Sequence, residues 1–169
     1  MIIDNFLPEE EFKSLQKAIM WRDNVKFNLN SVVAVNDERQ SLDNWYGTSM
    51  IYVDDVPWSE HYEDIISIFG PRLEDFASLI RIKINFYPHT KEIFEHKQHY
   101  DYNFSHQAAI FCLNTCDGYT RIGEDTIIES VENRFYTFDG SIPHNSTTTT
   151  NAKGRFNLNF NYMKAQKFL

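Results

Sequence analysis

The sequence has few cysteines, no long apolar run and no cluster of basic residues. Two cysteines, Cys112 and Cys116, are too few for a disulfide framework and fit a reducing compartment. No apolar run approaches the length of about 18 residues that a membrane-spanning helix needs. The sixteen Lys and Arg are scattered through a chain of net charge −8, which argues against a nucleic-acid partner. The N-terminal residues lack a basic region and a small-residue cleavage site, so we expect a cytoplasmic protein without membrane association.

The composition is that of one globular domain. The 169 residues suffice for a single well-buried core, and we expect one domain over residues 1–169 because no internal repeat or linker interrupts them. Aromatic residues make up 15% of the chain, which favours strands over helices.

The N-terminal part predicts two helices. Pro8 and three glutamates fit the start of the first helix, and Phe12, Leu15 and Ile19 recur at helical spacing. The second helix is expected over residues 59–69, where Gly70 and Pro71 would end it. We therefore assign residues 1–79 to a helical part.

Residues 80–169 predict strands. In residues 81–87 and 155–162, apolar and polar residues alternate with a period of two, which is typical of strands with one buried and one polar face. Shorter β-rich runs cover residues 108–113, 126–128 and 134–138. The order of elements predicts an α+β, mainly β chain that forms a barrel or jelly roll, with the N-terminal helices on one sheet and the polar faces lining a cavity.

His99, Asp101 and His144 are the candidate metal ligands. Residues i and i+2 of an extended strand project from the same face, so His99 and Asp101 can bind one ion together. His144 from another strand would complete a set of two histidines and one carboxylate. This set suits iron(II), because it leaves coordination positions open for a cosubstrate and dioxygen.

Arg155 is the candidate anchor for an anion. It begins the second alternating strand on the face expected to point inward, where an unpaired guanidinium is unfavourable. Its planar fork matches a carboxylate, so Arg155 could hold a dicarboxylic acid against the metal.

From about residue 80 to its end, the chain resembles the iron(II)- and 2-oxoglutarate-dependent dioxygenases, in the branch related to prolyl 4-hydroxylases. The similarity lies in Phe86-Tyr87-Pro88 before His99-Tyr100-Asp101, in residues 109–114 ending Leu-Asn, in Asp117-Gly118-Tyr119-Thr120, and in Gly154-Arg155-Phe156. The whole stretch is most similar to small homologues in marine phages, which would place the protein in the host cytoplasm. Cys112 departs from the family pattern, where some members have a tyrosine near this position.

The resemblance implies a double-stranded β-helix and a set of roles. Iron(II) would be bound by His99, Asp101 and His144, and 2-oxoglutarate by Arg155 and Tyr87. Dioxygen would convert 2-oxoglutarate to succinate and carbon dioxide while an unactivated C–H bond is hydroxylated, and ascorbate could support the reaction. The prime substrate would be a peptide or a small molecule, with a peptidyl proline as the leading candidate by analogy and residues 25–46 and 102–107 as the loops that select it.

Two other functions remain open on the sequence. One is a non-catalytic or sugar-binding jelly-roll module, and the other is a cupin-like metalloenzyme that uses no 2-oxoglutarate. Among the remaining candidates, we expect Cys112 in the core and His89, His96 and His106 at the surface.

Overall fold

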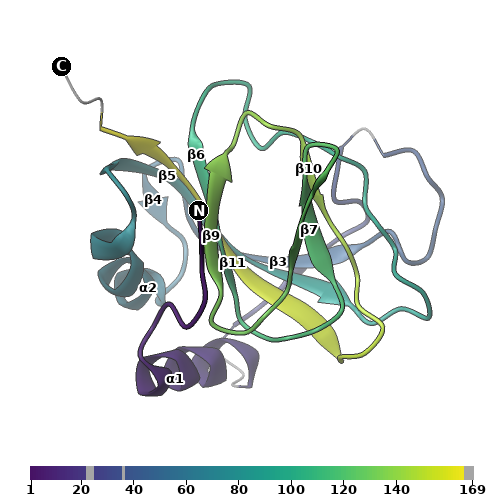
Figure 1. The fold of residues 1–169 in the computed structure, drawn as a ribbon, viewed down its shortest axis with the longest axis horizontal. Helices are drawn as coiled ribbons and strands as arrows, with labels where there is room; N and C mark the ends of the chain where they lie inside the picture. The colour runs from purple at the N-terminus through teal and green to yellow at the C-terminus, as the bar shows by residue number, and fades with distance from the viewer. Residues whose placement is uncertain (22–24, 36, 166–169) are drawn as a thin grey trace.

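The computed structural model describes residues 1–21, 25–35 and 37–165. Its elements in chain order are β1 (Ile2–Ile3), α1 (Glu9–Met20), β2 (Asn28–Asn30), β3 (Tyr46–Val53), β4 (Val56–Pro57), α2 (Tyr62–Phe69), a 3-10 turn (Gly70–Arg72), β5 (Phe76–Pro88), β6 (Gln107–Cys112), β7 (Tyr119–Ile122), β8 (Thr126–Glu129), β9 (Phe135–Asp139), β10 (His144–Ser146) and β11 (Gly154–Lys164) (Figure 1).

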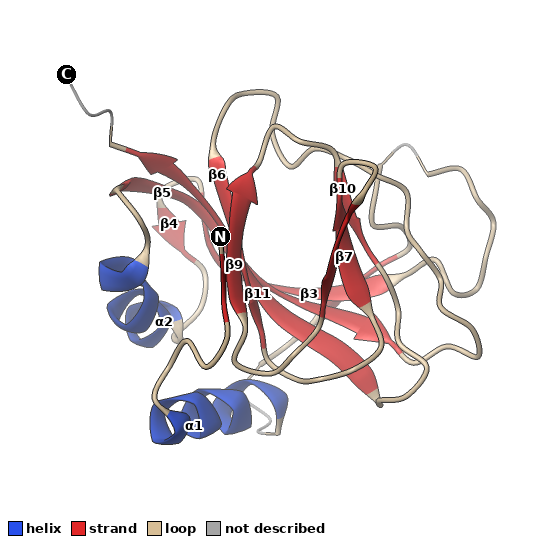
Figure 2. Ribbon diagram, viewed as in Figure 1, coloured by secondary structure: helices blue, strands red, loops and turns tan. Residues whose placement is uncertain are grey.

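Two antiparallel sheets form the body of the protein. The larger sheet has eight strands in the order β1-β9-β6-β11-β5-β3-β2, with β4 added beside β3, and the smaller sheet has the order β10-β7-β8. The two sheets face each other, and both helices lie on the outer side of the larger sheet (Figure 2). This arrangement confirms the expected double-stranded β-helix, or jelly roll, with N-terminal helices packed on one sheet.

Both helices pack through the faces that the sequence predicts. The three apolar residues of α1, Phe12, Leu15 and Ile19, are buried. The second helix starts three residues later than expected, at Tyr62, because Ser59 accepts a hydrogen bond from the backbone of His61 in a turn before the first helical residue. It ends at Gly70-Pro71 as predicted. Within the described chain, no helix is long and apolar enough to cross a membrane.

The alternation along β5 and β11 sorts their residues as predicted. Ile82 and Ile84 of β5 and Leu158 and Phe160 of β11 belong to the core beneath the helices. The opposite face is polar, and Arg155 on it reaches across to Thr120 of the smaller sheet. The polar faces therefore line the space between the two sheets, and the predicted phase is confirmed.

The N-terminal part contributes more strand than the sequence analysis assigned to residues 1–79. β3 pairs with β5 and lies inside the larger sheet, β1 pairs with β9 at its edge, and β5 already begins at Phe76. Burial alternates along β3, but Gly47 and Ser49 occupy buried positions. Polarity therefore does not follow burial in this strand, which is why the alternation was not visible in the sequence.

Candidate metal centre

His99, Asp101 and His144 come together where the segment between β5 and β6 meets β10. His99 lies in the segment between β5 and β6, and His144 begins β10. The two histidines form an isolated antiparallel bridge, in which each backbone N–H donates to the other's carbonyl oxygen at 3.0 Å. The bridge extends the segment locally, so Asp101 projects on the same side as His99, as the spacing predicted. Two distant parts of the chain thus meet at one point.

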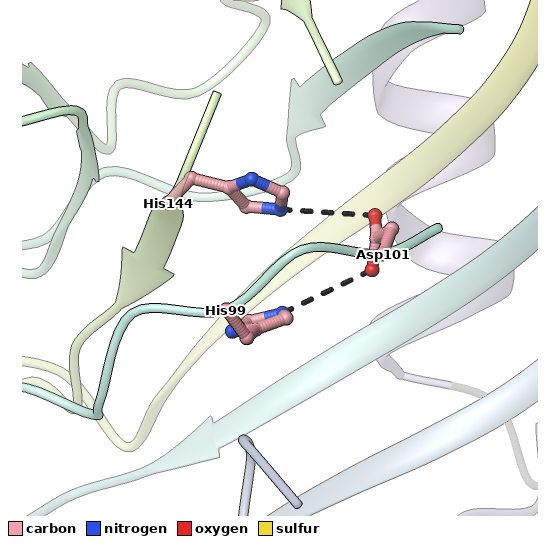
Figure 3. A group of neighbouring side chains, drawn as sticks. All are labelled: His99, Asp101 and His144. Carbon is pink, nitrogen blue, oxygen red and sulfur yellow. Dashed lines mark ion pairs between the residues drawn. The ribbon is translucent and has the colours of Figure 1, made fainter. Parts of the chain in front are cut away.

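The three side chains present their ligand atoms to one another (Figure 3). Nε2 of His99 lies 3.9 Å from one carboxylate oxygen of Asp101, and Nε2 of His144 lies 3.7 Å from the other. One ligand atom from each residue lies within 4.8 Å of the other two. Metal–ligand bonds of roughly 2.1 Å would bring neighbouring ligand atoms to about 3 Å, so small side-chain adjustments suffice to enclose an ion.

Hydrogen bonds orient both imidazoles for binding through Nε2. Nδ1 of His144 lies 3.0 Å from the carbonyl oxygen of Ile142, and Nδ1 of His99 lies 3.5 Å from that of Lys97. A proton on Nδ1 of His144 can be donated to its carbonyl, which leaves the Nε2 lone pair free. Histidines that ligate metals commonly use their second nitrogen in this way.

The electrostatic environment keeps His99 and Asp101 in their metal-binding forms. Burial, followed by the neighbouring His144, lowers the pKa of His99 to about 4, so its imidazole is neutral near pH 7. Burial alone would raise the pKa of Asp101, but Lys83, His144 and Arg81 together hold it well below its usual range. Two imidazoles and one ionised carboxylate on one side, with room for further ligands, fit iron(II).

Two residues that the sequence analysis did not single out hold Asp101 in place. Nη2 of Arg81 lies 2.7 Å from one carboxylate oxygen, and the Asn161 amide donates to the other at 3.0 Å. Both residues lie on the inward polar faces of β5 and β11, where they pair in register. The only sequence signal for them was that shared phase.

Arg155 is fully buried and has unused hydrogen-bond donors. Its Nη2 donates to Thr120 at 2.7 Å, while Nε and Nη1 have no partner. No Asp or Glu within the described residues forms an ion pair with it. A buried guanidinium without an anion is unfavourable, so this corner of the cavity fits a carboxylate supplied by a ligand.

Gly118 packs directly against the Arg155 side chain. A Cβ atom at this position would lie 2.7 Å from the carbonyl oxygen of Thr148 and 2.8 Å from Cδ of Arg155. Both distances are shorter than van der Waals contact allows. The absence of a side chain at Gly118 therefore gives Arg155 its space.

Tyr87 lies beside Arg155. It is buried, its ring stacks on that of Tyr46 with the centroids 5.8 Å apart, and the Arg155 guanidinium carbon lies 5.3 Å from its centroid. Burial raises the pKa of its phenol, while Arg155 and a hydrogen bond with Ser146 oppose that shift. The hydroxyl is therefore protonated at neutral pH. The predicted site residues thus form two groups. One is the set of three candidate ligands, and the other is Arg155 with Tyr87.

Two of the other histidines differ from expectation. His89 is exposed and Cys112 is buried, as predicted. His96 and His106 were expected at the surface, but they are 1% and 5% exposed. The backbone N–H of His96 donates to the carbonyl oxygen of Ser146 in β10. The Nδ1 atom of His96 lies 3.2 Å from the side-chain oxygen of Asn44. These tertiary contacts bury a residue whose neighbours in sequence are charged.

The buried His96 should make the protein less stable in acid. Burial, followed by the nearby Arg39, lowers its pKa from 6.5 to about 4. The unfolded state therefore takes up the proton first, and stability is lost as the pH falls from about 6.5 towards 4. At about 1.4 kcal/mol per pKa unit, this residue should account for about 3 kcal/mol of that loss.

The measurement is urea unfolding at several pH values for wild type and His96→Gln. The variant should show the flatter dependence, since His99 and the other titrating groups are common to both proteins. Parallel curves would contradict the prediction.

No family model and no curated protein sequence matches this chain. Several solved structures do match it. A prolyl-4-hydroxylase from Pseudomonas putida is 15% identical, with a TM-score of 0.65 over 97% of this chain and 92% of that one. An oxidoreductase of the 2OG-Fe(II) oxygenase family from Burkholderia pseudomallei is 12% identical, with a TM-score of 0.70 over 98% and 85%. A prolyl hydroxylase from Trichoplax adhaerens, in complex with a peptide fragment of the hypoxia inducible factor oxygen degradation domain, is 14% identical, with a TM-score of 0.62 over 97% and 83%. At these identities the comparisons establish a shared fold, the jelly roll of the 2-oxoglutarate oxygenases.

Proposed function

We propose that this protein is an iron(II)- and 2-oxoglutarate-dependent dioxygenase that hydroxylates an unactivated C–H bond. One observation carries the proposal. The polar faces of β5 and β11 that hold Asp101 through Arg81 and Asn161 also carry Arg155, a fully buried guanidinium with two unpartnered nitrogens. A metal site alone would not require this arginine, whereas a metal-binding dicarboxylic acid explains both features.

Each residue has a role in this reaction. His99, Asp101 and His144 would hold iron(II), and Arg155 would pair with the distal carboxylate of 2-oxoglutarate, with the Tyr87 hydroxyl beside it. Bound iron(II) would supply the oxidising chemistry, in which 2-oxoglutarate, dioxygen and the substrate C–H group become succinate, carbon dioxide and the alcohol. The buried walls around Arg155 exclude water from the cosubstrate. Arg81 and Asn161 would keep the Asp101 carboxylate oriented towards the metal.

A prime substrate could reach the metal through two hollows that flank it. One of about 500 Å³ is lined by residues 100–105 and Ser141 and includes Asp101. The other, of about 290 Å³, is lined by residues 33–35 and 98–100 and includes His99. Both are formed partly by the segments predicted to select the substrate. We propose a peptide substrate, with a prolyl residue as the hydroxylated group, and the peptide bound to the Trichoplax adhaerens neighbour supports this choice.

Anaerobic titration followed by exposure to oxygen tests the proposal. Iron(II) and then 2-oxoglutarate are added without oxygen, and a weak visible charge-transfer band should appear. Oxygen should then yield succinate, and proline-rich peptides screened by mass spectrometry should accelerate its formation. Metal binding without binding of 2-oxoglutarate would instead support the cupin-like metalloenzyme. A protein that binds neither would support the non-catalytic module, and an oxygen-free sample of wild type is the control for background succinate.

A further inference from the structure

Aromatic side chains alternate along the segment that contains His99 and Asp101. Tyr100, Tyr102, Phe104 and His106 are each separated by one residue. The rings of Tyr102 and Phe104 lie 5.2 Å apart, and the His106 ring lies 5.4 Å from the first and 5.7 Å from the second. These distances are in the range of attractive aromatic contacts. The alternation therefore builds a packed cluster from Tyr102, Phe104 and His106.

His106 forms the buried base of this aromatic cluster. It is 5% exposed, and its Nδ1 lies 2.9 Å from the carbonyl oxygen of Phe104. Gly140 makes room for the imidazole, because a Cβ atom at that position would collide with the ring. The base of the cluster is thus fixed by packing and by a polar contact.

Arg81 joins the aromatic cluster to the candidate metal centre. Its guanidinium carbon lies 5.2 Å from the centre of the Tyr102 ring, which is within the range of a cation–π contact. Nη2 of the same guanidinium lies 2.7 Å from the Asp101 carboxylate. The rings and a proposed metal ligand therefore share one anchor, which fixes the position of the rings relative to the metal.

The aromatic cluster forms one wall of the hollow of about 500 Å³ that includes Asp101. Tyr102 and Phe104 line this hollow together with Tyr100, and the last two are 44% and 58% exposed. Among the described residues that line the hollow, Asp101 alone has a formal charge, and Arg81 pairs with it. A charged group that entered would lose water without gaining a partner, whereas an apolar ring could stack on the exposed rings.

We propose that this hollow binds an apolar ring side chain of a peptide substrate, next to the residue that is hydroxylated, and that Tyr100 and Phe104 select it. The inference rests on the proposed function and deepens it, because it adds a requirement on the sequence beside the target residue. The hollow includes Asp101, so its occupant lies close to the group presented to the metal. The second hollow, lined by residues 33–35 and 98–100, contains only Tyr100 of these rings.

Three peptides test the inference. Each contains one proline, which is flanked on both sides by phenylalanine, by lysine or by aspartate. Calorimetry without oxygen gives their affinities for the metal-free protein and for the protein loaded with iron(II) and 2-oxoglutarate. Wild type should bind the phenylalanine peptide about 10- to 100-fold more tightly than the other two, the usual gain from burying a large apolar side chain. The net charge of −8 would by itself favour the lysine peptide, so general electrostatics would not produce this order.

Variants of Phe104 assign the preference to the hollow. Phe104→Ser removes an exposed ring and should lose most of the preference for the phenylalanine peptide, whereas Phe104→Tyr keeps a ring and should retain it. Trp58→Ser is the matched control, because Trp58 is an aromatic residue that is 68% exposed and lines neither hollow. Iron(II) binding by each variant checks that it is folded, since neither position is a proposed ligand.

The outcomes distinguish this inference from the proposed function. The inference is overturned if wild type shows no preference for the phenylalanine peptide, or if Phe104→Ser keeps that preference. It is also overturned if wild type converts 2-oxoglutarate to succinate but binds none of the peptides, a result that would indicate a small-molecule substrate. If the metal-free protein prefers the phenylalanine peptide but the iron-loaded protein binds no 2-oxoglutarate, the hollow is a peptide site and the proposed function fails.

Discussion

Replacing Asp101 with alanine should weaken iron(II) binding by more than about 100-fold and abolish turnover. Changes to groups that merely support a metal ligand cost 10- to 100-fold, and Asp101 is proposed as a ligand itself. It is also the carboxylate of the set, and without it two imidazoles would face the cations Arg81 and Lys83. The remaining cavity would repel a divalent ion. Metal content after anaerobic loading and dialysis measures the effect.

The matched variants for Asp101 separate charge from shape. Asp101→Asn keeps the volume and the hydrogen bond with Asn161 but removes the negative charge, so it should lose the metal almost as completely as Asp101→Ala. Asp125→Ala, at an exposed aspartate, should load with iron(II) as wild type does. Wild-type iron affinity in Asp101→Ala would rule this site out.

Replacing Arg155 with alanine should weaken 2-oxoglutarate binding by about 30-fold to several thousandfold. The estimate follows from a loss of about 2–5 kcal/mol when one member of a buried charge pair is removed, at about 1.4 kcal/mol per factor of ten. Iron(II) binding should survive, because Arg155 is not a proposed ligand. Titration of 2-oxoglutarate into iron-loaded protein without oxygen gives both values.

Two further arginine variants control that experiment. Arg155→Lys should rescue binding only in part, since it offers a point charge and not a planar fork. Arg134→Ala removes an arginine that forms an ion pair with Asp4 outside the cavity, and it should leave 2-oxoglutarate binding unchanged. An unchanged affinity in Arg155→Ala would move the anchoring role to another cation, and Lys83, on the inward polar face of β5, is the next candidate.

The parts of the fold that the sequence predicted correctly are those where apolar and polar residues separate onto opposite faces of a strand. Along β5 and β11, apolar residues pack beneath the helices and polar residues face the cavity, so a period of two was enough to place Arg155 inside. In β3 this relation fails, because small residues such as Gly47 fill buried positions. β3 is therefore recognised as a strand only from its pairing with neighbouring strands such as β5.

In the candidate site, too, the sequence predicted what depends on local geometry and missed what depends on tertiary contacts. The spacing of His99 and Asp101 reports a shared face, which depends only on local backbone geometry. The contact of Asp101 with Arg81 and Asn161 depends on how a loop folds over two strands, and no local pattern encodes it. The burial of His96 likewise follows from its bonds to Asn44 and Ser146, which lie 52 and 50 positions away in the numbering of the chain.

Gly118 has a consequence for the size of the ligand. Any side chain there would collide with the Thr148 backbone and with Cδ of Arg155, and of these two the arginine side chain is the one free to move. It would have to leave its present position. The absence of a side chain at Gly118 therefore fixes where the guanidinium lies. That position sets the length of the acid that could reach from the proposed metal site to Arg155.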